Sequence, residues 1–168
     1  MNMITISQYT KEEQEIIDVR GLAFLNRLKF GKEAEEAFYR KCIQYRIDCP
    51  PPSPLKLYNS QESRQDFLYG DFPIFGNVDV KRVSISYKSS QGYIGEWFCL
   101  SNRDLSQLVM LKSIFMKKYM RIKKANDGLK KLSSTDEGWS FDRKCMKLQE
   151  KFGFDYGIPI DEWLSSRA

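Results

Sequence analysis

The spacing of apolar residues divides the chain into a helical amino-terminal part, a β-rich centre and a second helical part. Residues 6–20 begin with polar helix-capping candidates and continue at helical spacing, and residues 21–30 either extend this helix or break it at Gly21. Another helical pattern follows Gly31. Four prolines in the five positions 50–54 then predict a rigid, extended connector, because proline fits neither a helix interior nor a central strand.

The β-rich centre follows a polar stretch, residues 59–65, which we expect to be a loop. Two short strands are predicted on either side of a turn at Gly76-Asn77. The first lies within 66–75, and the second covers 78–87, where β-branched residues alternate with polar ones. The alternation slips at Arg82-Val83, so we expect a β-bulge at that point.

Beyond these strands the pattern returns to helical spacing. Residues 89–92 predict a turn, and 93–100 predict a central strand because they are dense in aromatic side chains. A long helical pattern runs through 102–124, and a last helix is predicted over 140–152. The aromatic residues of 152–164 are expected to dock on the body of the protein.

These elements predict a mixed α/β fold, a central mixed β-sheet flanked by helices, in one domain over 1–168. The net charge of +5 suits a polyanionic partner. The amino terminus lacks a basic segment followed by an apolar run, and no apolar stretch approaches the roughly 20 residues of a membrane helix. We therefore expect a cytoplasmic protein without a membrane partner.

The chain contains no histidine, which excludes catalytic triads, cysteine–histidine proteases and histidine-dependent nucleases. Catalysis would have to use carboxylates, lysine, tyrosine, cysteine or a metal. The spacing of the four cysteines makes a zinc site improbable, and we expect reduced, mostly buried thiols. A phosphate-binding loop of the GxxxxGK[ST] type is also missing from the sequence.

Asp79-Val80-Lys81 is the most informative stretch of the chain. Residues i and i+2 of a strand share a face, so Asp79 and Lys81 should point to one side and Val78 and Val80 to the other. A carboxylate and an ammonium on one face, beside a second carboxylate at Asp71, can hold a divalent metal and prepare a water for attack on a phosphodiester. Without such a site, Asp79 and Lys81 are a plain ion pair on an exposed sheet face.

The order of these acids resembles the PD-(D/E)XK nuclease superfamily, the fold of many restriction enzymes and junction resolvases. The matching segments are Gly31-Lys-Glu-Ala-Glu35 on the predicted helix, Asp71 in YGDFPIFGN, and Asp79-Val80-Lys81. With the following strand they span about 31–100, and the resemblance implies a restriction-endonuclease-like core.

Three positions leave the match open. The family often has a glycine four residues before the helix glutamate, which selects Glu35 over its neighbour Glu36, although Glu35 also suits a solvated helix face. Gly70 stands where the family has a proline before the second acid. Asp66 is an alternative to Asp71 if the strand register differs.

The resemblance implies an endonuclease that hydrolyses DNA with Mg²⁺, for which Mn²⁺ is a substitute. Asp71, Asp79 and the carbonyl of Val80 would hold the metal, and Glu35 would contact it directly or through water. Lys81 would orient or help to deprotonate the attacking water and stabilise charge on the phosphorane. The metal's charge would lower the pKa of Lys81.

The predicted DNA contacts lie downstream of the D-x-K motif, at Arg82, Lys88 and Gln91. Cleavage of both strands of a duplex needs two active sites, so the resemblance also implies a homodimer. The rival reading is a non-catalytic nucleic-acid-binding or interaction protein of a phage or mobile element. In that case the lysine-rich helix binds phosphates and the D-x-K motif is incidental.

Overall fold

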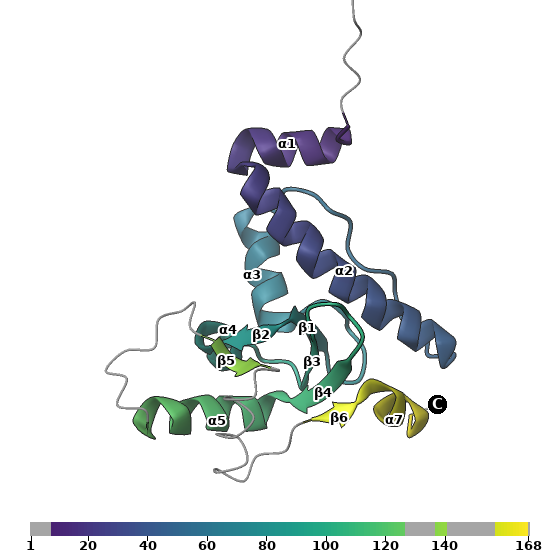
Figure 1. Cartoon of the computed structure of the whole chain (residues 1–168), viewed down its shortest axis with the longest axis vertical. Coiled ribbons are helices and arrows are strands. Elements are labelled where there is room, and N and C mark those ends of the chain that lie inside the picture. Colours follow the sequence, from purple (N-terminus) through teal and green to yellow (C-terminus); the bar gives the residue numbers. More distant parts are fainter. Residues whose placement is uncertain (1–7, 127–136, 141–156, 168) are drawn as a thin grey trace, which may run out of the picture.

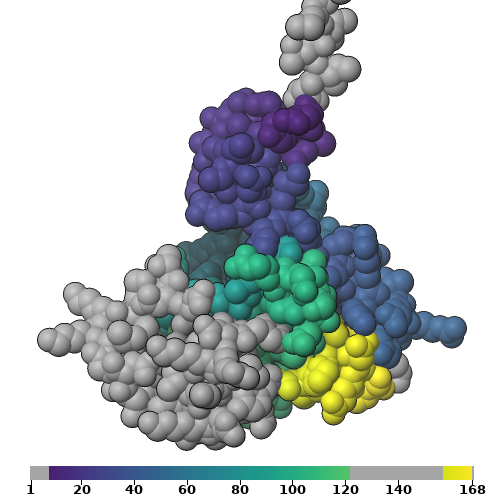
Figure 2. All heavy atoms as spheres, in the orientation of Figure 1, coloured from purple at the N-terminus to yellow at the C-terminus, as the bar shows by residue number. Residues whose placement is uncertain are grey.

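The structure is a computed structural model that describes residues 8–126, 137–140 and 157–167. Helices α1 (Lys11–Arg20) and α2 (Leu22–Gln44) are separated at Gly21, whose φ of 94° ends the first helix as the predicted break requires. Thr10 caps α1 through reciprocal hydrogen bonds with Glu13. α1 and the first turns of α2 form a projection that rises above the strands, and the rest of α2 runs down beside the sheet (Figures 1 and 2).

The expected loop over 59–65 is instead helix α3 (Ser60–Tyr69), so that prediction is wrong. Asn59 begins the helix: its side chain accepts from the Glu62 N–H, and the Glu62 carboxylate accepts from the Asn59 N–H. Polar composition concealed the helix, because α3 has no fully buried residue and therefore no apolar stripe.

The strand expected within 66–75 is also largely wrong. Its first residues belong to α3, and the remainder contributes one antiparallel bridge, from Phe72 to Val78, across the predicted Gly76-Asn77 turn. Both residues of that turn have positive φ, 83° and 76°, as glycine and asparagine readily allow. The chain therefore enters the next strand through a tight reversal.

A four-stranded mixed sheet forms the centre of the molecule in the order β1-β3-β4-β6. The strand β3 is central, as predicted, and it runs parallel to β1 and antiparallel to β4. Helices flank this sheet (Figure 1), so the predicted α/β class is confirmed. The strands are β1 (Val78–Arg82), β3 (Trp97–Ser101), β4 (Leu108–Lys112) and β6 (Ile158–Pro159).

The slip predicted near Arg82-Val83 is a break between two strands. Val83 has a φ of 76°, which is strained for a β-branched residue, and the chain leaves the main sheet there. It continues as β2 (Ser84–Ser86), which pairs antiparallel with β5 (Glu137–Ser140) in a separate two-stranded sheet. Strand β1 of the main sheet therefore ends at Arg82.

The remaining elements correct three predictions. The turn expected at 89–92 is part of helix α4 (Tyr87–Gly92). The helix expected over 102–124 is divided into strand β4 and helix α5 (Ser113–Asn126), because an apolar run fits either element and pairing with β3 decides between them. Ser140, the expected cap of a helix over 140–152, lies in β5, and 141–152 lie outside the described residues.

Two apolar clusters cover the two faces of the sheet. One joins α2 to the sheet through Phe38, Val78 and Val80, and it includes the carboxyl-terminal helix α7 (Ile160–Ser165). The other packs α5 against Phe98. Trp163 of α7 is 1% exposed and meets Phe75 and Trp97 edge-on, at centroid distances of 5.0 and 5.2 Å, which confirms that this aromatic docks.

Three cysteines, Cys42, Cys49 and Cys99, are buried free thiols, as expected, and Cys145 lies outside the described residues. Burial raises the pKa of Cys42 to about 12, so its thiol stays protonated. Among the described helices, none combines the length and apolar character needed to cross a membrane.

Candidate active site

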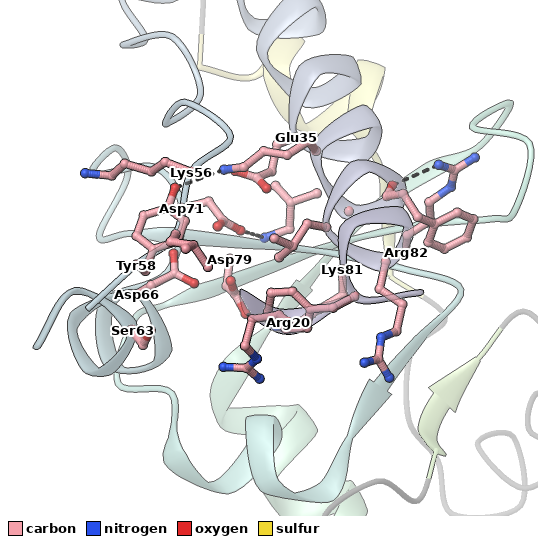
Figure 3. A pocket seen from close by; sticks show the side chains of 18 residues that line it. Arg20, Glu35, Lys56, Tyr58, Ser63, Asp66, Asp71, Asp79, Lys81 and Arg82 are labelled. Atoms are coloured by element: carbon pink, nitrogen blue, oxygen red, sulfur yellow. Dashed lines mark hydrogen bonds and ion pairs between the residues drawn. The ribbon is translucent and has the colours of Figure 1, made fainter. Parts of the chain in front are cut away.

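A cavity of about 380 Å³ lies where α2, the connector before α3, α3 itself and β1 meet. Figure 3 shows its lining, in which acidic side chains gather between basic ones. Four carboxylates line the cavity: Glu35, Asp66, Asp71 and Asp79. The structure therefore brings together Glu35, Asp71 and Asp79, together with the alternative at Asp66, whereas the alternative Glu36 lies outside the cavity.

Asp71 is held against the free edge of β1. Its Oδ2 accepts a hydrogen bond from the Val80 N–H, at 2.7 Å, and its own N–H donates to the Val78 carbonyl, at 3.0 Å. Gly70 permits this approach with a φ of 77°: a Cβ there would lie 2.9 Å from both the Asp79 Cβ and the Val78 carbonyl oxygen. Glycine is thus required where the resemblance leads one to expect proline.

The carbonyl of Val80 faces the same edge as the Asp71 carboxylate. In an extended strand the N–H and C=O of one residue point to the same side. The Val80 N–H is directed at Asp71 and away from β3, so its carbonyl also points away from β3. This backbone oxygen is available beside the acids, as a metal ligand at that position requires.

Asp79 and Lys81 share a face of β1, as the strand period predicts. Their Oδ2 and Nζ atoms are 3.2 Å apart, and Val78 and Val80 lie in the apolar cluster on the other face. Asp79 is 5% exposed, whereas the Lys81 side chain is 34% exposed, so the pair joins a buried carboxylate to a partly exposed ammonium. Burial alone would lower the pKa of Lys81, but Asp79 and Asp71 together raise it, and the ammonium keeps its proton at neutral pH.

Glu35, and not Glu36, faces the cavity from α2. Glu35 is 8% exposed, and its Oε1 lies 3.1 Å from the Lys32 Nζ, one helical turn earlier. Glu36 lies outside the cavity and pairs with Arg40 at 3.4 Å. Burial raises the pKa of Glu35, because the charged form loses hydration that Lys32 only partly replaces.

Two of the four carboxylates in the cavity lack a cationic partner at ion-pair distance among the residues that the structure describes, although six basic side chains line the cavity. Burial raises the pKa of Asp66, and it raises the pKa of Asp71 well above its usual value; nearby Asp79 adds to both shifts. Within the described chain, Asp79 and Glu35 each have a lysine at ion-pair distance, whereas Asp66 and Asp71 have none. Such a group favours either bound protons or a bound cation.

The chemistry of these donors fits Mg²⁺, a hard ion that takes carboxylate and carbonyl oxygens. The oxygens of Asp71, Asp79, Glu35 and Val80 are of this kind, and the uncompensated charge would be neutralised by a divalent cation. Over residues 8–126, 137–140 and 157–167, no three acidic or thiol side chains already surround one point as a metal site. Binding would therefore draw the ligands inward or complete the shell with water, which Mg²⁺ readily retains.

The predicted DNA contacts do not form one group. Arg82 lines the cavity, but its guanidinium donates to the carbonyls of Phe30, at 2.9 Å, and Arg103, at 3.0 Å, and stacks on the Phe30 ring. Lys88 and Gln91 lie on α4, outside the cavity lining. A DNA-binding role for these three residues stays a prediction.

Comparisons of the chain with protein-family models, with curated proteins and with solved structures found no match. The residues of the cavity are therefore the basis for inferring a function.

Sequence reasoning missed the basic side chains around the acids. Lys32 could have been noticed, because it precedes Glu35 by three residues and so shares its helix face. Its Nζ also lies 3.5 Å from the Tyr58 hydroxyl oxygen. No local pattern marks the others, which reach the cavity from separate segments: Arg20, Arg27 and Lys56.

Proposed function

We propose that this protein is a divalent-metal-dependent nuclease that hydrolyses DNA phosphodiester bonds at the cavity beside β1. The observation that carries the proposal is the convergence of Asp71, Asp79, Glu35 and Lys81 from three elements on one small cavity. Acids at the edge of a mixed sheet, one of them from a flanking helix, are also what a restriction-endonuclease-like core supplies, and we include that core in the proposal.

The chain's own groups divide the chemistry between binding and charge stabilisation. Asp71, Asp79 and the Val80 carbonyl would hold Mg²⁺, which supplies Lewis-acid polarisation of the phosphate and a more acidic water. Asp71 keeps its place through the Val80 N–H, so its other oxygen can face the ligand. Glu35, paired with Lys32, can accept a hydrogen bond from the attacking water.

Lys81 supplies positive charge where negative charge develops. Its pKa is raised, so it acts as an ammonium that stabilises the phosphorane, rather than as a base. The attacking water gives a proton to the Glu35 carboxylate as its oxygen forms the new bond to phosphorus, the bond from phosphorus to the leaving oxygen breaks, and that oxygen takes up a proton. Lys81 can donate this proton if it lies on the leaving side.

The test is nicking of supercoiled plasmid, with linear and single-stranded DNA as further substrates, in Mg²⁺, Mn²⁺ or EDTA. Cleavage is expected with either metal and not with EDTA, and Asp79→Asn should abolish it. Glu35→Gln should slow it strongly, whereas Glu36→Gln removes the same charge from the adjacent position outside the cavity and should leave it unchanged.

Equal cleavage by wild type, Asp79→Asn and Glu35→Gln would refute the assignment. DNA binding without cleavage of any of these substrates would favour the rival, a nucleic-acid-binding protein without catalysis. We also propose a homodimer, because cleavage of both strands of a duplex needs two active sites. Sedimentation velocity of the full chain on DNA can test this.

A further inference from the structure

Two arginines at the start of the helical projection share one aromatic ring. The guanidinium carbon of Arg20, the last residue of α1, lies 4.3 Å from the centroid of Phe24, and that of Arg27 lies 5.8 Å from it. Because both distances refer to the same ring, the two guanidinium groups are no more than about 10 Å apart. Like charges at this spacing repel unless an anion offsets them.

Neither arginine has such an anion in the described part of the chain, where no carboxylate lies within ion-pair distance of Arg20 or Arg27. Two neighbouring arginines already have partners within the protein. Arg40 pairs with Glu36, and Arg82 donates hydrogen bonds to backbone carbonyls. The planar groups stacked near Phe24 therefore keep their N–H donors available for a ligand.

Both side chains line the same cavity as the four carboxylates, and Figure 3 draws Arg20 among the lining residues. A nucleic-acid strand that reaches these four carboxylates brings its own negative charge close to them. Cations at the rim must offset that repulsion. Arg20, at the end of α1, and Arg27, in the first turns of α2, are two such cations in the cavity lining.

We propose that Arg20 and Arg27 form a phosphate-binding site that holds the nucleic-acid backbone beside the bond to be cleaved. This inference rests on the proposed function, because it takes the strand at the carboxylates to be nucleic acid. Guanidinium groups suit the role since their fork of N–H donors matches phosphate oxygens. The two residues are positioning residues: they hold flanking phosphates and take no part in bond cleavage.

The site predicts a defined salt dependence. Each phosphate contact releases counterions, so log K against log salt concentration has a slope of about −0.9 per contact on duplex DNA. Loss of both arginines should therefore make the slope shallower by about 2, together with a fall in affinity at low salt.

The experiment measures binding of a fluorescently labelled oligonucleotide duplex to the full chain by anisotropy, over a series of KCl concentrations in EDTA and again in Ca²⁺. The variants are Arg20→Ala/Arg27→Ala and the control Arg40→Ala/Arg64→Ala. The control makes the same change in net charge at two exposed positions outside the cavity. Melting curves confirm that both variants fold.

The expected result is a shallower slope for Arg20→Ala/Arg27→Ala and an unchanged slope for the control. Equal slopes in the two variants, or no binding by wild type at low salt, would overturn the proposal. A slope change without cleavage by wild type in Mg²⁺ upholds the phosphate site and refutes the hydrolysis. If cleavage depends on Asp79 but the two variants have equal salt slopes, the hydrolysis is upheld and the phosphate site is refuted.

Discussion

The Asp71 carboxylate accepts a hydrogen bond from the backbone N–H of Val80, with 2.7 Å between Oδ2 and N. This bond lies on the free edge of β1, where a further strand would otherwise pair. Val80 is flanked in sequence by Asp79 and Lys81, so the bond fixes one acid against the other two charged groups. Burial raises the pKa of Asp71, and the nearby Asp79 carboxylate raises it further.

Asp71→Asn should stabilise the protein while it removes cleavage. The asparagine carbonyl can still accept from Val80, and its amide donates toward the neighbouring carboxylates instead of repelling them. We expect a gain of about 0.5–2 kcal/mol in the free energy of unfolding at neutral pH, the usual scale for relief at a functional site. Urea unfolding measures it. Asp104→Asn, at an exposed turn where hydrogen bonds lower the pKa, should give no gain, and a destabilised Asp71→Asn would contradict the prediction.

The stability difference between Asp71→Asn and wild type should grow as pH rises. A carboxyl whose pKa is raised in the folded state keeps its proton where the unfolded chain has lost it. Its stabilising contribution is therefore present near pH 4, the ordinary pKa of the unfolded group, and is lost as pH rises through the folded value. Melting temperatures of both proteins from pH 4.5 to about 8.5 test this window.

Mg²⁺ should reduce that difference at the alkaline end, because a bound cation offsets the charge of wild type and has less to offset in the variant. The same melting series with and without MgCl₂ provides the measurement. A difference in stability that stays constant across pH and metal concentration would show that the pKa of Asp71 is not raised and that Mg²⁺ does not bind beside it.

Lys81→Met should lower the rate of Mg²⁺-dependent cleavage by about 10²–10³-fold, the scale for losing one transition-state charge contact. The side chain keeps its length and apolar stem but loses the ammonium that pairs with Asp79. Single-turnover kinetics on a defined duplex measures the loss. Lys118→Met, on the exposed side of α5, removes the same charge and should cleave normally. Retained activity in Lys81→Met would exclude this role.

Gly70→Ala should impair the site, whereas Gly31→Ala should not. At Gly70 the φ of 77° and the contact of a new Cβ with Asp79 would force β1 and Asp71 apart. Gly31, inside α2, also lines the cavity, but a Cβ there would meet nothing within 4 Å, and the helix should gain about 0.5–1 kcal/mol. Urea unfolding and nicking assays on both variants compare them. Equal stability and equal nicking activity of the two variants would show that the close contact of Gly70 with β1 is not needed for the site.

Trp163→Ala should destabilise the fold by about 3–5 kcal/mol, as expected for loss of a fully buried large side chain. The ring fills the contact between α7 and the sheet, against Phe75 and Trp97. Ile158→Ala, at a position 38% exposed in β6, should cost much less. Denaturant midpoints of the two variants give the comparison, and similar midpoints would mean that α7 contributes little to the core.

The sequence by itself determined the geometry within β1. The side-chain period of two follows from the backbone of any strand, so Asp79 and Lys81 had to share a face once residues 78–82 were extended. The same local reasoning located the slip near Val83 and included a break at Gly21 as one of two alternatives, and the backbone leaves its regular path at both residues. The central, aromatic strand β3 was also predictable, because such residues favour a pleated, buried surface.

Local pattern could not separate helix from strand at α3 and β4. Helix α3 has no buried stripe and is defined by its Asn59–Glu62 cap, and the apolar run of β4 became a strand because β3 offered it a partner. The same limit hid the composition of the cavity. Lys32, Asp66 and Arg20 lie on three different helices, and only packing brings them around Asp71. Backbone geometry is set over a few residues, whereas the charge balance of a cavity is set by side chains far apart in the chain, so only the tertiary structure could decide it.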